Sequence, residues 1–367
     1  MTRADWQPSW PIWWDEAHAG KGHPVTTRVG INGFGRIGRN FLRAVLRSGS
    51  SIEVVAFNEP MTSAEVSTQL LRYDSTHGRL DLPVGLSGTS LSVGDKEIQV
   101  LSERDPKALP WSDLGVDVVI ESTGVFTDGQ KAAAHLEAGA SKVIISAPAT
   151  DVDATFVIGV NDSDYDPARH HVISNASCTT NCFVPMVKVL DDAFGVRKGL
   201  MTTVHAYTND QNLLDLAHKD PRRARAAAVN IVPTSTGAAR ATSLVMEAMK
   251  GRLDGYSLRV PVQSGSITDF TAVVVGQVDK DAVNAAFNAA ATEGPLSEVL
   301  VYTEDPIVSS DIVGAPASCT FDSLLTMTMD LDDTSSLVKV FGWYDNEWGY
   351  SNRLVDLARI VGRAAGA

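Results

Sequence analysis

A cysteine and a histidine carry the strongest chemical signal in this sequence. Cys178 lies in the stretch Ser174–Cys182 (SNASCTTNC), among small hydroxyl and amide side chains. An apolar periodicity begins just after it and predicts a helix that is closed by Gly195. A helix N-terminus stabilises a thiolate and can lower a cysteine pKa from about 8.5 into the range of roughly 3.5–7.5. We therefore interpret Cys178 as a nucleophile and not as a packing cysteine.

The histidine lies further along the chain, near the end of a predicted strand. The run Leu200–Tyr207 is rich in Thr and Val and carries His205. A thiolate beside an imidazole forms an activated pair, and the imidazole can also move protons during turnover. A histidine alone is more often structural, so the assignment of His205 as the catalytic partner depends on Cys178.

A glycine-rich turn near the beginning of the chain predicts a dinucleotide site. A strand at Arg28–Asn32 leads into the motif GFGRIG, and an amphipathic helix follows it. A second strand, Ile52–Phe57, ends beside Glu59, about 20 residues after the turn, where a carboxylate binds the ribose hydroxyls. This carboxylate repels the additional phosphate of NADP, so we predict NAD and keep NADP as the alternative. The predicted contacts are Gly33, Phe34, Gly35, Arg36, Ile37, Gly38 and Glu59.

Composition and charge limit the classes of function. The chain has 367 residues, 44% of them hydrophobic, which is enough for two domains with buried cores. A net charge of −13 opposes a main role in binding nucleic acid or anionic lipid, and no apolar run predicts a membrane span. Three cysteines without a disulfide framework suit the reducing cytoplasm. We predict no metal site.

The pattern of elements predicts an α/β protein with two different sheets. Residues 27–177 predict a Rossmann-type NAD-binding domain on a mostly parallel sheet, and residues 178–345 an α+β catalytic domain on a mostly antiparallel sheet. Residues 346–367 predict a C-terminal helix that starts at Trp348. Further expected elements are strands at Val116–Ile120, Lys142–Ser146, Phe156–Val160, His171–Ile173, Leu258–Gln263 and Ile267–Gly276, and a helix at Asp281–Thr292.

Residues 1–26 form an N-terminal extension of unusual composition. It carries Trp6, Trp10, Trp13 and Trp14 and lacks the unbroken apolar core of a secretory signal. Exposed tryptophans are costly, so we expect this tail to dock on its own surface or on a neighbouring subunit. The alternative is a loosely ordered extension.

Five segments resemble the phosphorylating glyceraldehyde-3-phosphate dehydrogenase family in order and spacing. They are SNASCTTNC, TTVHAYTNDQ, HKDPRRARAAAVNIVPTSTGAAR, RVPVQSGSITDF and WYDNEWGYSNR, and the likeness covers roughly residues 27 to 363. It implies oxidation of glyceraldehyde 3-phosphate with NAD and inorganic phosphate, through a thioester on Cys178, to 1,3-bisphosphoglycerate in glycolysis or gluconeogenesis. It also implies a homotetramer in which the loop Asp210–Pro233 crosses a subunit interface, and a last helix that packs against the first domain.

The resemblance assigns the remaining site residues. It places Thr208, Arg223 and Arg259 at the substrate phosphate, and Ser177, Thr179, Thr236 and Gly237 at the attacking phosphate. Hydroxyl and guanidinium groups are the side chains that phosphate recognition needs. The implied cofactor contacts beyond the glycine turn are Ser122, Thr123, Gly124, Phe126, Ser146, Asn346 and Tyr350.

Two other functions stay open at this point. Glu59 stands where most relatives have aspartate, and a glutamate at this position is typical of erythrose-4-phosphate dehydrogenases. Ala217 replaces a proline that is usual in NAD-dependent relatives, which bears on the choice between NAD and NADP. The segment Thr234–Ala239 and the residue Thr208 favour the glyceraldehyde 3-phosphate enzyme instead. A redox-sensing or scaffold protein that uses an oxidisable Cys178 is the second alternative, but it would need no phosphate-binding residues.

Overall fold

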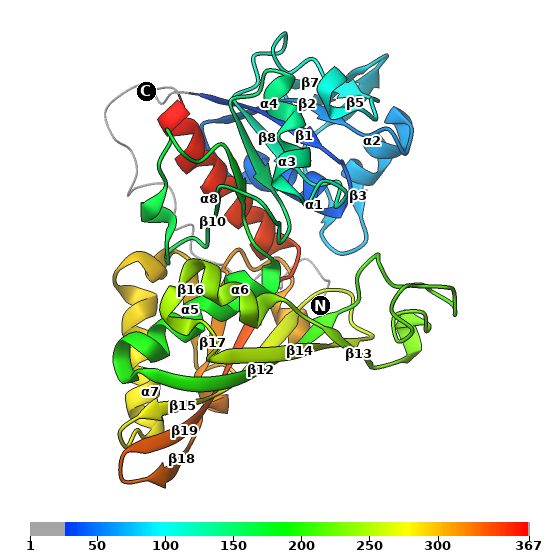
Figure 1. The fold of residues 1–367 in the computed structure, drawn as a ribbon. Helices are drawn as coiled ribbons and strands as arrows, with labels where there is room; N and C mark the ends of the chain where they lie inside the picture. The colour runs from blue at the N-terminus through cyan, green and yellow to red at the C-terminus, as the bar shows by residue number, and fades with distance from the viewer. Residues whose placement is uncertain (1–25, 366–367) are drawn as a thin grey trace.

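The computed structural model describes residues 26–365, which form two large sheets with helices packed on them (Figure 1). The predicted tail, residues 1–26, lies almost entirely outside the described residues. The boundaries proposed above for the domains stay a prediction.

The first sheet carries nine strands and is mainly parallel. Across the sheet they are β10 (Ala154–Thr155), β11 (Val172–Ser174), β9 (Lys142–Ile145), β8 (Val118–Glu121), β1 (Thr27–Asn32), β2 (Ile52–Asn58), β7 (Lys96–Leu101), β6 (Ser90–Val93) and β5 (Val84–Ser87). Among the described residues, β5–β6 and β6–β7 are the only antiparallel pairs of this sheet. Its central strands β1 and β8 are apolar runs buried on both faces, as parallel sheets covered by helices require.

Helices and a small hairpin complete this part of the chain. The helices are α1 (Arg36–Ser48), α2 (Ala64–Arg72), α3 (Gly129–Ala132) and α4 (Ala134–Glu137), and the hairpin pairs β3 (Tyr73–Asp74) with β4 (Gly78–Arg79). Helix α1 ends at Gly49, whose φ of 59° places it in the left-handed region that favours glycine.

The second sheet has eight strands and is mainly antiparallel. In order they are β13 (Val232–Ser235), β14 (Leu253–Val260), β12 (Val196–Ala206), β15 (Ser266–Val275), β19 (Ser335–Tyr344), β17 (Cys319–Asp322) and β16 (Leu300–Thr303), with β18 (Met327–Asp332) paired to β19. Within the described chain only β12–β14 and β16–β17 of this sheet are parallel. These two sheets confirm the predicted fold class.

Helices cover one face of the second sheet. Helix α5 (Cys178–Phe194) packs against β15, β17 and β19, with α6 (Ala238–Val245) and α7 (Lys280–Thr292) beside it. The burial of β15 alternates along its length, and Phe270 on its buried side meets Phe183 of α5 with ring centroids 4.8 Å apart. Short 3-10 helices lie at Pro106–Ala108, Asp162–Asp164, Ala227–Val229, Glu247–Met249, Pro295–Glu298, Ser309–Ile312 and Ser323–Leu325.

The last helix joins the two sheets. Helix α8 (Trp348–Ala365) follows directly on β19 of the second sheet and packs against α1, β1, β8 and β9 of the first (Figure 1). Leu354, Leu357 and Val361 are fully buried on one side of it. A Cβ built on Gly362 would lie 2.1 Å from Thr27 Oγ1, so the helix and β1 approach as closely as only glycine permits.

One predicted strand is a turn, and another predicted strand has different bounds. The run Phe156–Val160 forms a turn after β10, because the side chain of Asn161 bonds both Thr155 O and Val157 N and wraps the chain around Gly159. The strand expected at Leu258–Gln263 is β14, which starts at Leu253 and ends at Val260. Pro261 follows it and has no N–H for a further ladder bond.

None of the helices between residues 26 and 365 has the length and apolar character of a membrane span. The same residues contain no group of three or more His, Cys, Asp or Glu side chains that could hold a metal ion.

Candidate active site

Cys178 is the first residue of α5, where the sequence placed it. The chain leaves β11 at Ser174 and enters the helix three residues later, at the carboxyl edge of the first sheet. Ser177 is the N-cap, and its Oγ accepts a hydrogen bond of 3.0 Å from the Thr180 amide. The nucleophile is thus fixed to the start of a rigid helix.

His205 lies beside it on the second sheet. Cys178 Sγ and His205 Nε2 are 3.5 Å apart, and His205 Nδ1 lies 2.7 Å from the carbonyl oxygen of Ala206. A carbonyl can only accept, so Nδ1 carries the proton and Nε2 presents its lone pair to the sulfur. The geometry sets His205 to take the proton of the thiol.

Burial controls the charge state of this pair. Burial raises the pKa of the Cys178 thiol to about 11, although Arg259 and the Thr179 side chain act in the opposite direction. Burial also lowers the pKa of His205 to about 3, and the positive charge of Arg259 adds to that shift. Burial thus favours the thiol form of Cys178 and the neutral imidazole of His205. The pKa of Cys178 is thus raised, not lowered as its position at a helix N-terminus led us to expect, and desolvation is the largest cause of this shift.

Arg259 lies next to the pair because of strand register. Strands β12 and β14 run parallel with His205 directly opposite Arg259. Arg259 Nη1 lies 3.2 Å from His205 Nδ1, and it donates to Ala206 O at 3.2 Å and to Thr208 Oγ1 at 2.8 Å. One guanidinium thus contacts both the base and a predicted phosphate-binding residue.

The three residues predicted for the substrate phosphate lie in one cluster around a carboxylate. Thr208 Oγ1 donates to Asp210, and Arg223 Nη1 forms an ion pair with the same side chain. Arg223 Nε also donates to Thr234 Oγ1 at 2.8 Å. Asp210 was missed from the sequence, where its only signal is its position two residues after Thr208. The contacts of the Asp210 carboxylate with Thr208 and Arg223 show that this cluster accommodates an anion.

The four residues predicted for the attacking phosphate are not brought together by any hydrogen bond. Ser177 caps α5, and Thr179 Oγ1 lies 2.8 Å from the hydroxyl of buried Tyr344, so both hydroxyls already have protein partners. Thr236 and Gly237 stand at the start of α6, which packs against α5. A Cβ built on Gly237 would meet nothing within 4 Å, and the Ala238 amide donates to Thr236 Oγ1 at 3.2 Å.

The glycine turn has the shape that a dinucleotide needs. Gly33 has a φ of 92°, and a Cβ built on it would lie 2.6 Å from the Thr123 nitrogen. A Cβ on Gly38 would lie 2.2 Å from the carbonyl oxygen of Gly33. At Gly35, the N-cap of α1, nothing lies within 4 Å and no side chain caps the helix. The free N–H groups there fit a pyrophosphate.

Glu59 reaches this turn from the end of β2. Its carboxylate accepts from the Phe34 amide at 3.0 Å and from the Met61 amide at 3.0 Å. The longer side chain therefore lies against the backbone of the turn.

A buried polar network supports residues 122–124, which are predicted to contact the cofactor. Glu121 accepts from the amide and hydroxyl of Thr123, from Asn32 Nδ2 at 2.6 Å and from His135 Nε2 at 3.0 Å. Trp111 donates to His135 Nδ1, so the proton of His135 is on Nε2 and points at Glu121. This network was not predicted, because its members come from distant segments that read as ordinary core.

The remaining predicted cofactor residues lie around the same edge. The Ser146 amide donates to Glu121 O at 2.9 Å, and Phe126 packs edge-on against His135. Ser122 Oγ donates to Gly33 O at 2.7 Å, which ties residues 122–124 to the glycine turn.

Arg36 connects the glycine turn to the start of α8. It donates to Glu347 through Nε at 2.9 Å and also bonds Asp74. Burial alone would lower the pKa of Arg36, but the bonds to Glu347 and Asp74 outweigh it and raise that pKa. Burial of Asp74 is likewise outweighed, by the His77 amide and Arg36, which hold the pKa of this carboxyl at about 2.

The two residues predicted at the nicotinamide are both buried and both bonded. Asn346 Oδ1 accepts from Ser266 Oγ at 2.9 Å, and the Ser266 oxygen accepts from the Ala206 amide beside His205. The hydroxyl of Tyr350 donates to the carbonyl oxygen of Ala176 at 3.0 Å. Asn346 is thus oriented with its Nδ2 free to donate, whereas Tyr350 acts on the turn before Cys178.

A dinucleotide turn on one sheet and a cysteine–histidine pair beside an anion cluster on the next define a nicotinamide-nucleotide-dependent dehydrogenase with a cysteine nucleophile. Comparison with known proteins gives the family. The model of the glyceraldehyde 3-phosphate dehydrogenase NAD binding domain matches residues 27–129, and that of the C-terminal domain matches residues 177–346. This chain belongs to the glyceraldehyde 3-phosphate dehydrogenase family.

Curated relatives support the assignment over nearly the whole chain. The chain is 60% identical over 338 residues to a glyceraldehyde-3-phosphate dehydrogenase of Streptomyces coelicolor, covering 92% of this chain and 99% of the relative. It is likewise 60% identical over 338 residues to glyceraldehyde-3-phosphate dehydrogenase 2 of Streptomyces avermitilis, with the same coverage. It is 59% identical over 346 residues to the Mycobacterium tuberculosis enzyme of that name, covering 93% of this chain and 100% of the relative.

The cation of Arg259 predicts a specific pH dependence. Because this charge lowers the pKa of Cys178, Arg259→Gln removes a stabilising partner of the thiolate and raises that pKa. A shift on the order of one unit would slow alkylation by neutral iodoacetamide about tenfold below the midpoint of the pH–rate profile and move the midpoint upward. The measurement is the alkylation rate of Cys178 against pH, without cofactor. Arg259→Lys retains the charge and serves as the control; an Arg259→Gln profile that is unchanged or moves downward contradicts the interpretation.

Proposed function

We propose that this protein oxidises glyceraldehyde 3-phosphate with NAD and inorganic phosphate to 1,3-bisphosphoglycerate, through a thioester on Cys178. One observation carries the proposal. Arg259 contacts His205, which lies 3.5 Å from the Cys178 sulfur, and also contacts Thr208 of the anion cluster. Because the sulfur and the anion cluster lie this close together, one small substrate can place its carbonyl at the sulfur and its phosphoryl group at the cluster.

The first chemical step transfers the thiol proton. His205 Nε2 takes it as the sulfur attacks the aldehyde carbon, so that the C–S bond forms while the carbonyl π-bond breaks. The backbone N–H of Cys178 and the protonated His205 stabilise the oxyanion, and the imidazolium then gives it the proton.

The second step removes a hydride from the carbon and a proton from the hydroxyl of this hemithioacetal. NAD, when bound, supplies the acceptor for the hydride. His205 takes the hydroxyl proton as the hydride leaves the carbon, and a thioester remains on Cys178. A phosphate oxygen then attacks the thioester carbonyl, the C–S bond breaks, and His205 returns the proton to the departing sulfur. The acyl phosphate leaves and the thiol is restored.

The anion cluster binds the phosphate of the substrate in this proposal. Arg223 and Arg259 offer guanidinium forks, and Thr208 adds its hydroxyl, which together suit a phosphate dianion. The substrate competes with Asp210 for these groups. The attacking phosphate is assigned to Ser177, Thr179, Thr236 and Gly237, where the start of α6 offers backbone N–H groups.

Residues around the glycine turn and around residues 122–124 bind the cofactor in this proposal. Gly33, Phe34, Gly35, Arg36, Ile37 and Gly38 surround the pyrophosphate, Glu59 the ribose, and Ser122, Thr123, Gly124, Phe126 and Ser146 the neighbouring edge. Asn346, whose Oδ1 is held by Ser266, donates its Nδ2 to the ring carboxamide. Tyr350 packs nearby.

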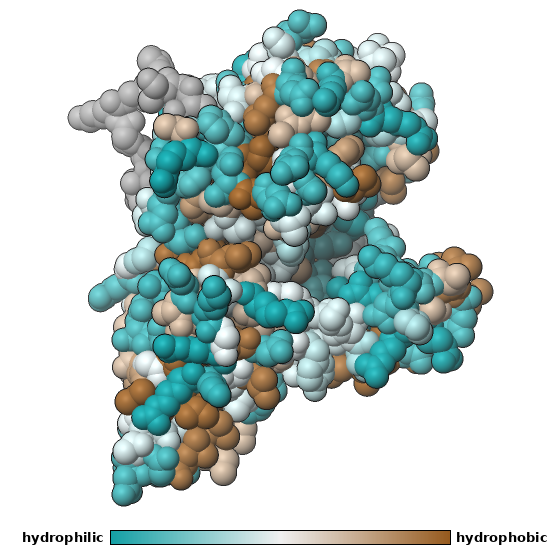
Figure 2. Space-filling view, viewed as in Figure 1, coloured by the Kyte–Doolittle hydropathy of each residue, from teal (hydrophilic) through white to brown (hydrophobic). Residues whose placement is uncertain are grey.

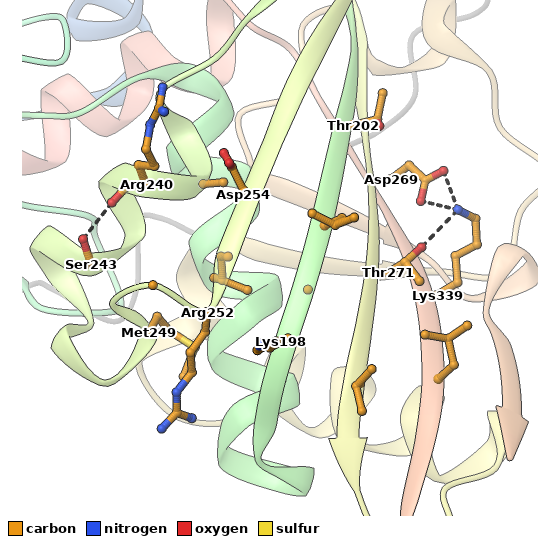
Figure 3. A pocket seen from close by; sticks show the side chains of 17 residues that line it. Lys198, Thr202, Arg240, Ser243, Met249, Arg252, Asp254, Asp269, Thr271 and Lys339 are labelled. Atoms are coloured by element: carbon orange, nitrogen blue, oxygen red, sulfur yellow. Dashed lines mark hydrogen bonds and ion pairs between the residues drawn. The ribbon is translucent and has the colours of Figure 1, made fainter. Parts of the chain in front are cut away.

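We also propose a cytoplasmic homotetramer. The loop of residues 207–231 projects from the body of the molecule, and apolar surface gathers at its tip (Figure 2). Leu213 and Leu214 in this loop are exposed. The uncovered face of the second sheet has a hollow of about 1020 Å³, in which Lys339 bonds Asp269 and Thr271 (Figure 3). Such a face with adjacent exposed apolar side chains suits contact with further copies of the chain.

The proposed chemistry predicts the behaviour of a cysteine variant. Cys178→Ser should lower NADH formation from glyceraldehyde 3-phosphate by more than about 1000-fold, because an alcohol lacks the nucleophilicity of a thiolate and no thioester forms. The dissociation constant of NAD should stay within about twofold, since the glycine turn is untouched. Cys182→Ala, on the same helix, is the matched control and should retain activity.

The same assay separates the rival functions. The wild-type rate should require inorganic phosphate, and glyceraldehyde 3-phosphate should be used better than erythrose 4-phosphate. A preference for erythrose 4-phosphate, which Glu59 would fit, or full activity in Cys178→Ser overturns the proposal.

The carboxylate beside the glycine turn predicts the choice of nucleotide. We expect kcat/KM to be higher for NAD than for NADP, because Glu59 repels the additional phosphate. Glu59→Gln should narrow this ratio by about tenfold, mainly through the KM for NADP. The control is Glu53→Gln, which changes an exposed acid on β2, the strand that precedes Glu59, and should leave the ratio unchanged. A wild-type preference for NADP would refute the assignment.

A further inference from the structure

We propose that Tyr350 is a positioning residue whose hydroxyl holds Ala176 in a left-handed conformation and thereby fixes the start of α5, so that Cys178 meets His205. This inference rests on the role proposed above for Cys178. It assigns to Tyr350 a task that is separate from any contact with the cofactor.

The backbone before the nucleophile is strained. Ala176 has a φ of 55° and is, with Asp151, one of two residues other than glycine that have a positive φ among residues 26–365. Aspartate tolerates this region through local hydrogen bonds of its side chain, but alanine has no such group. The left-handed conformation is unfavourable for an L-residue, because its Cβ comes too close to the following carbonyl oxygen. Such strain persists only where surrounding contacts enforce it.

Local bonds fix part of the turn. The Ala176 amide donates to Ser174 Oγ at 3.0 Å. Asn181 Nδ2, one turn inside α5, donates to the carbonyl oxygens of Asn175 at 2.9 Å and Ser177 at 3.0 Å. These donors and acceptors belong to the same short stretch of chain, so they would move together with it if the turn relaxed.

Tyr350 anchors the Ala176 carbonyl from outside this stretch. Other bonds to distant residues, from the Asn175 amide to Ile145 O and from Ser174 Oγ to Ala147 O, lie before Ala176. The hydroxyl of Tyr350 comes from α8 and donates to the Ala176 carbonyl oxygen, across 174 positions of sequence. The ring is buried in the main core, and α8 is packed along the first sheet, so the donor cannot follow the turn. Burial raises the pKa of this hydroxyl, which keeps it protonated and able to donate.

The geometry links this tether to catalysis. Ala176 lies two residues before Cys178 and is 1% exposed. If its carbonyl oxygen loses the bond from Tyr350, no solvent replaces that donor. If the carbonyl is released, Ala176 can return to a right-handed or extended conformation, which rotates Ser177 and the first turn of α5. A displacement of about 1 Å at reacting atoms can cost up to roughly 100-fold in rate. The tether therefore preserves the 3.5 Å contact between Cys178 and His205.

The test is a cycle of four proteins: wild type, Tyr350→Phe, Ala176→Gly and the double variant. The primary measurement is the rate of Cys178 alkylation by iodoacetamide, followed by peptide mass spectrometry without cofactor or substrate. Tyr350→Phe should lower this rate about five- to tenfold. In the Ala176→Gly background the loss should shrink below about twofold, because glycine adopts the left-handed conformation without the tether.

Controls separate this role from general destabilisation. Tyr344→Phe removes another buried hydroxyl near the site, which contacts Thr179 and Thr203 but not Ala176; its effect should not change in the Ala176→Gly background. Ser174→Ala removes the acceptor of the Ala176 amide and should show the same rescue by Ala176→Gly. This second route keeps the test decisive if Tyr350→Phe folds poorly.

Two outcomes overturn the inference. One is an equal loss of alkylation rate from Tyr350→Phe in both backgrounds. The other is an unchanged alkylation rate with a raised KM for NAD, which makes Tyr350 a cofactor contact only. Alkylation needs no substrate, so its result tests the role of Tyr350 even if glyceraldehyde 3-phosphate proves not to be oxidised. Failure of this inference can therefore be distinguished from failure of the proposed function.

Discussion

Cys178 and His205 are in contact at a position where burial disfavours the charged form of each side chain. Desolvation favours the neutral thiol and the neutral imidazole, so an isolated pair in this position would be unreactive. Reactivity requires the proton to pass directly between them, and that in turn requires a fixed distance and the correct tautomer. The carbonyl of Ala206 fixes the tautomer, and Arg259 provides a positive charge that favours the thiolate. The fold is arranged to hold this geometry.

The two partners reach the site from different sheets. Cys178 comes from the carboxyl edge of the parallel sheet through the turn that starts α5, and His205 from β12 of the antiparallel sheet. The start of α8 joins the two: Arg36 and Glu347 connect it to the glycine turn, and Ser266 connects Asn346 to the strand of His205. The glycine turn and the Cys178–His205 pair are thus connected by the same junction. A shift of either sheet would move Cys178 relative to both His205 and the glycine turn.

Local patterns allowed part of this site to be predicted from the sequence. The glycine turn was predictable because a strand, a glycine motif and a helix follow one another, and the start of α5 because an apolar period begins after Cys178. The resemblance added Arg259 and Thr208, which are distant in sequence and meet only through the register of β12 and β14. Asp210 as an internal anion and the partners of Glu121 were missed, because neither has a local signal.

Other features depend on contacts that a sequence pattern does not encode. The left-handed turn at Ala176 carries no glycine, since a tyrosine from α8 enforces it. The pKa of Cys178 was predicted in the wrong direction because helix position is local, whereas desolvation depends on the complete packing. The apolar run after β10 resembled a strand, but a single asparagine side chain folds it into a turn.

The account depends most on a sulfur that carries the acyl group between two half-reactions. The direct measurement is to mix the protein with NAD and glyceraldehyde 3-phosphate in the absence of phosphate, quench in acid and determine the mass of the peptide that contains Cys178. The account predicts one 3-phosphoglyceroyl group on this cysteine, which disappears when inorganic phosphate is added before the quench. A peptide that stays unmodified while NADH forms, or an acyl group found on another residue, would contradict it.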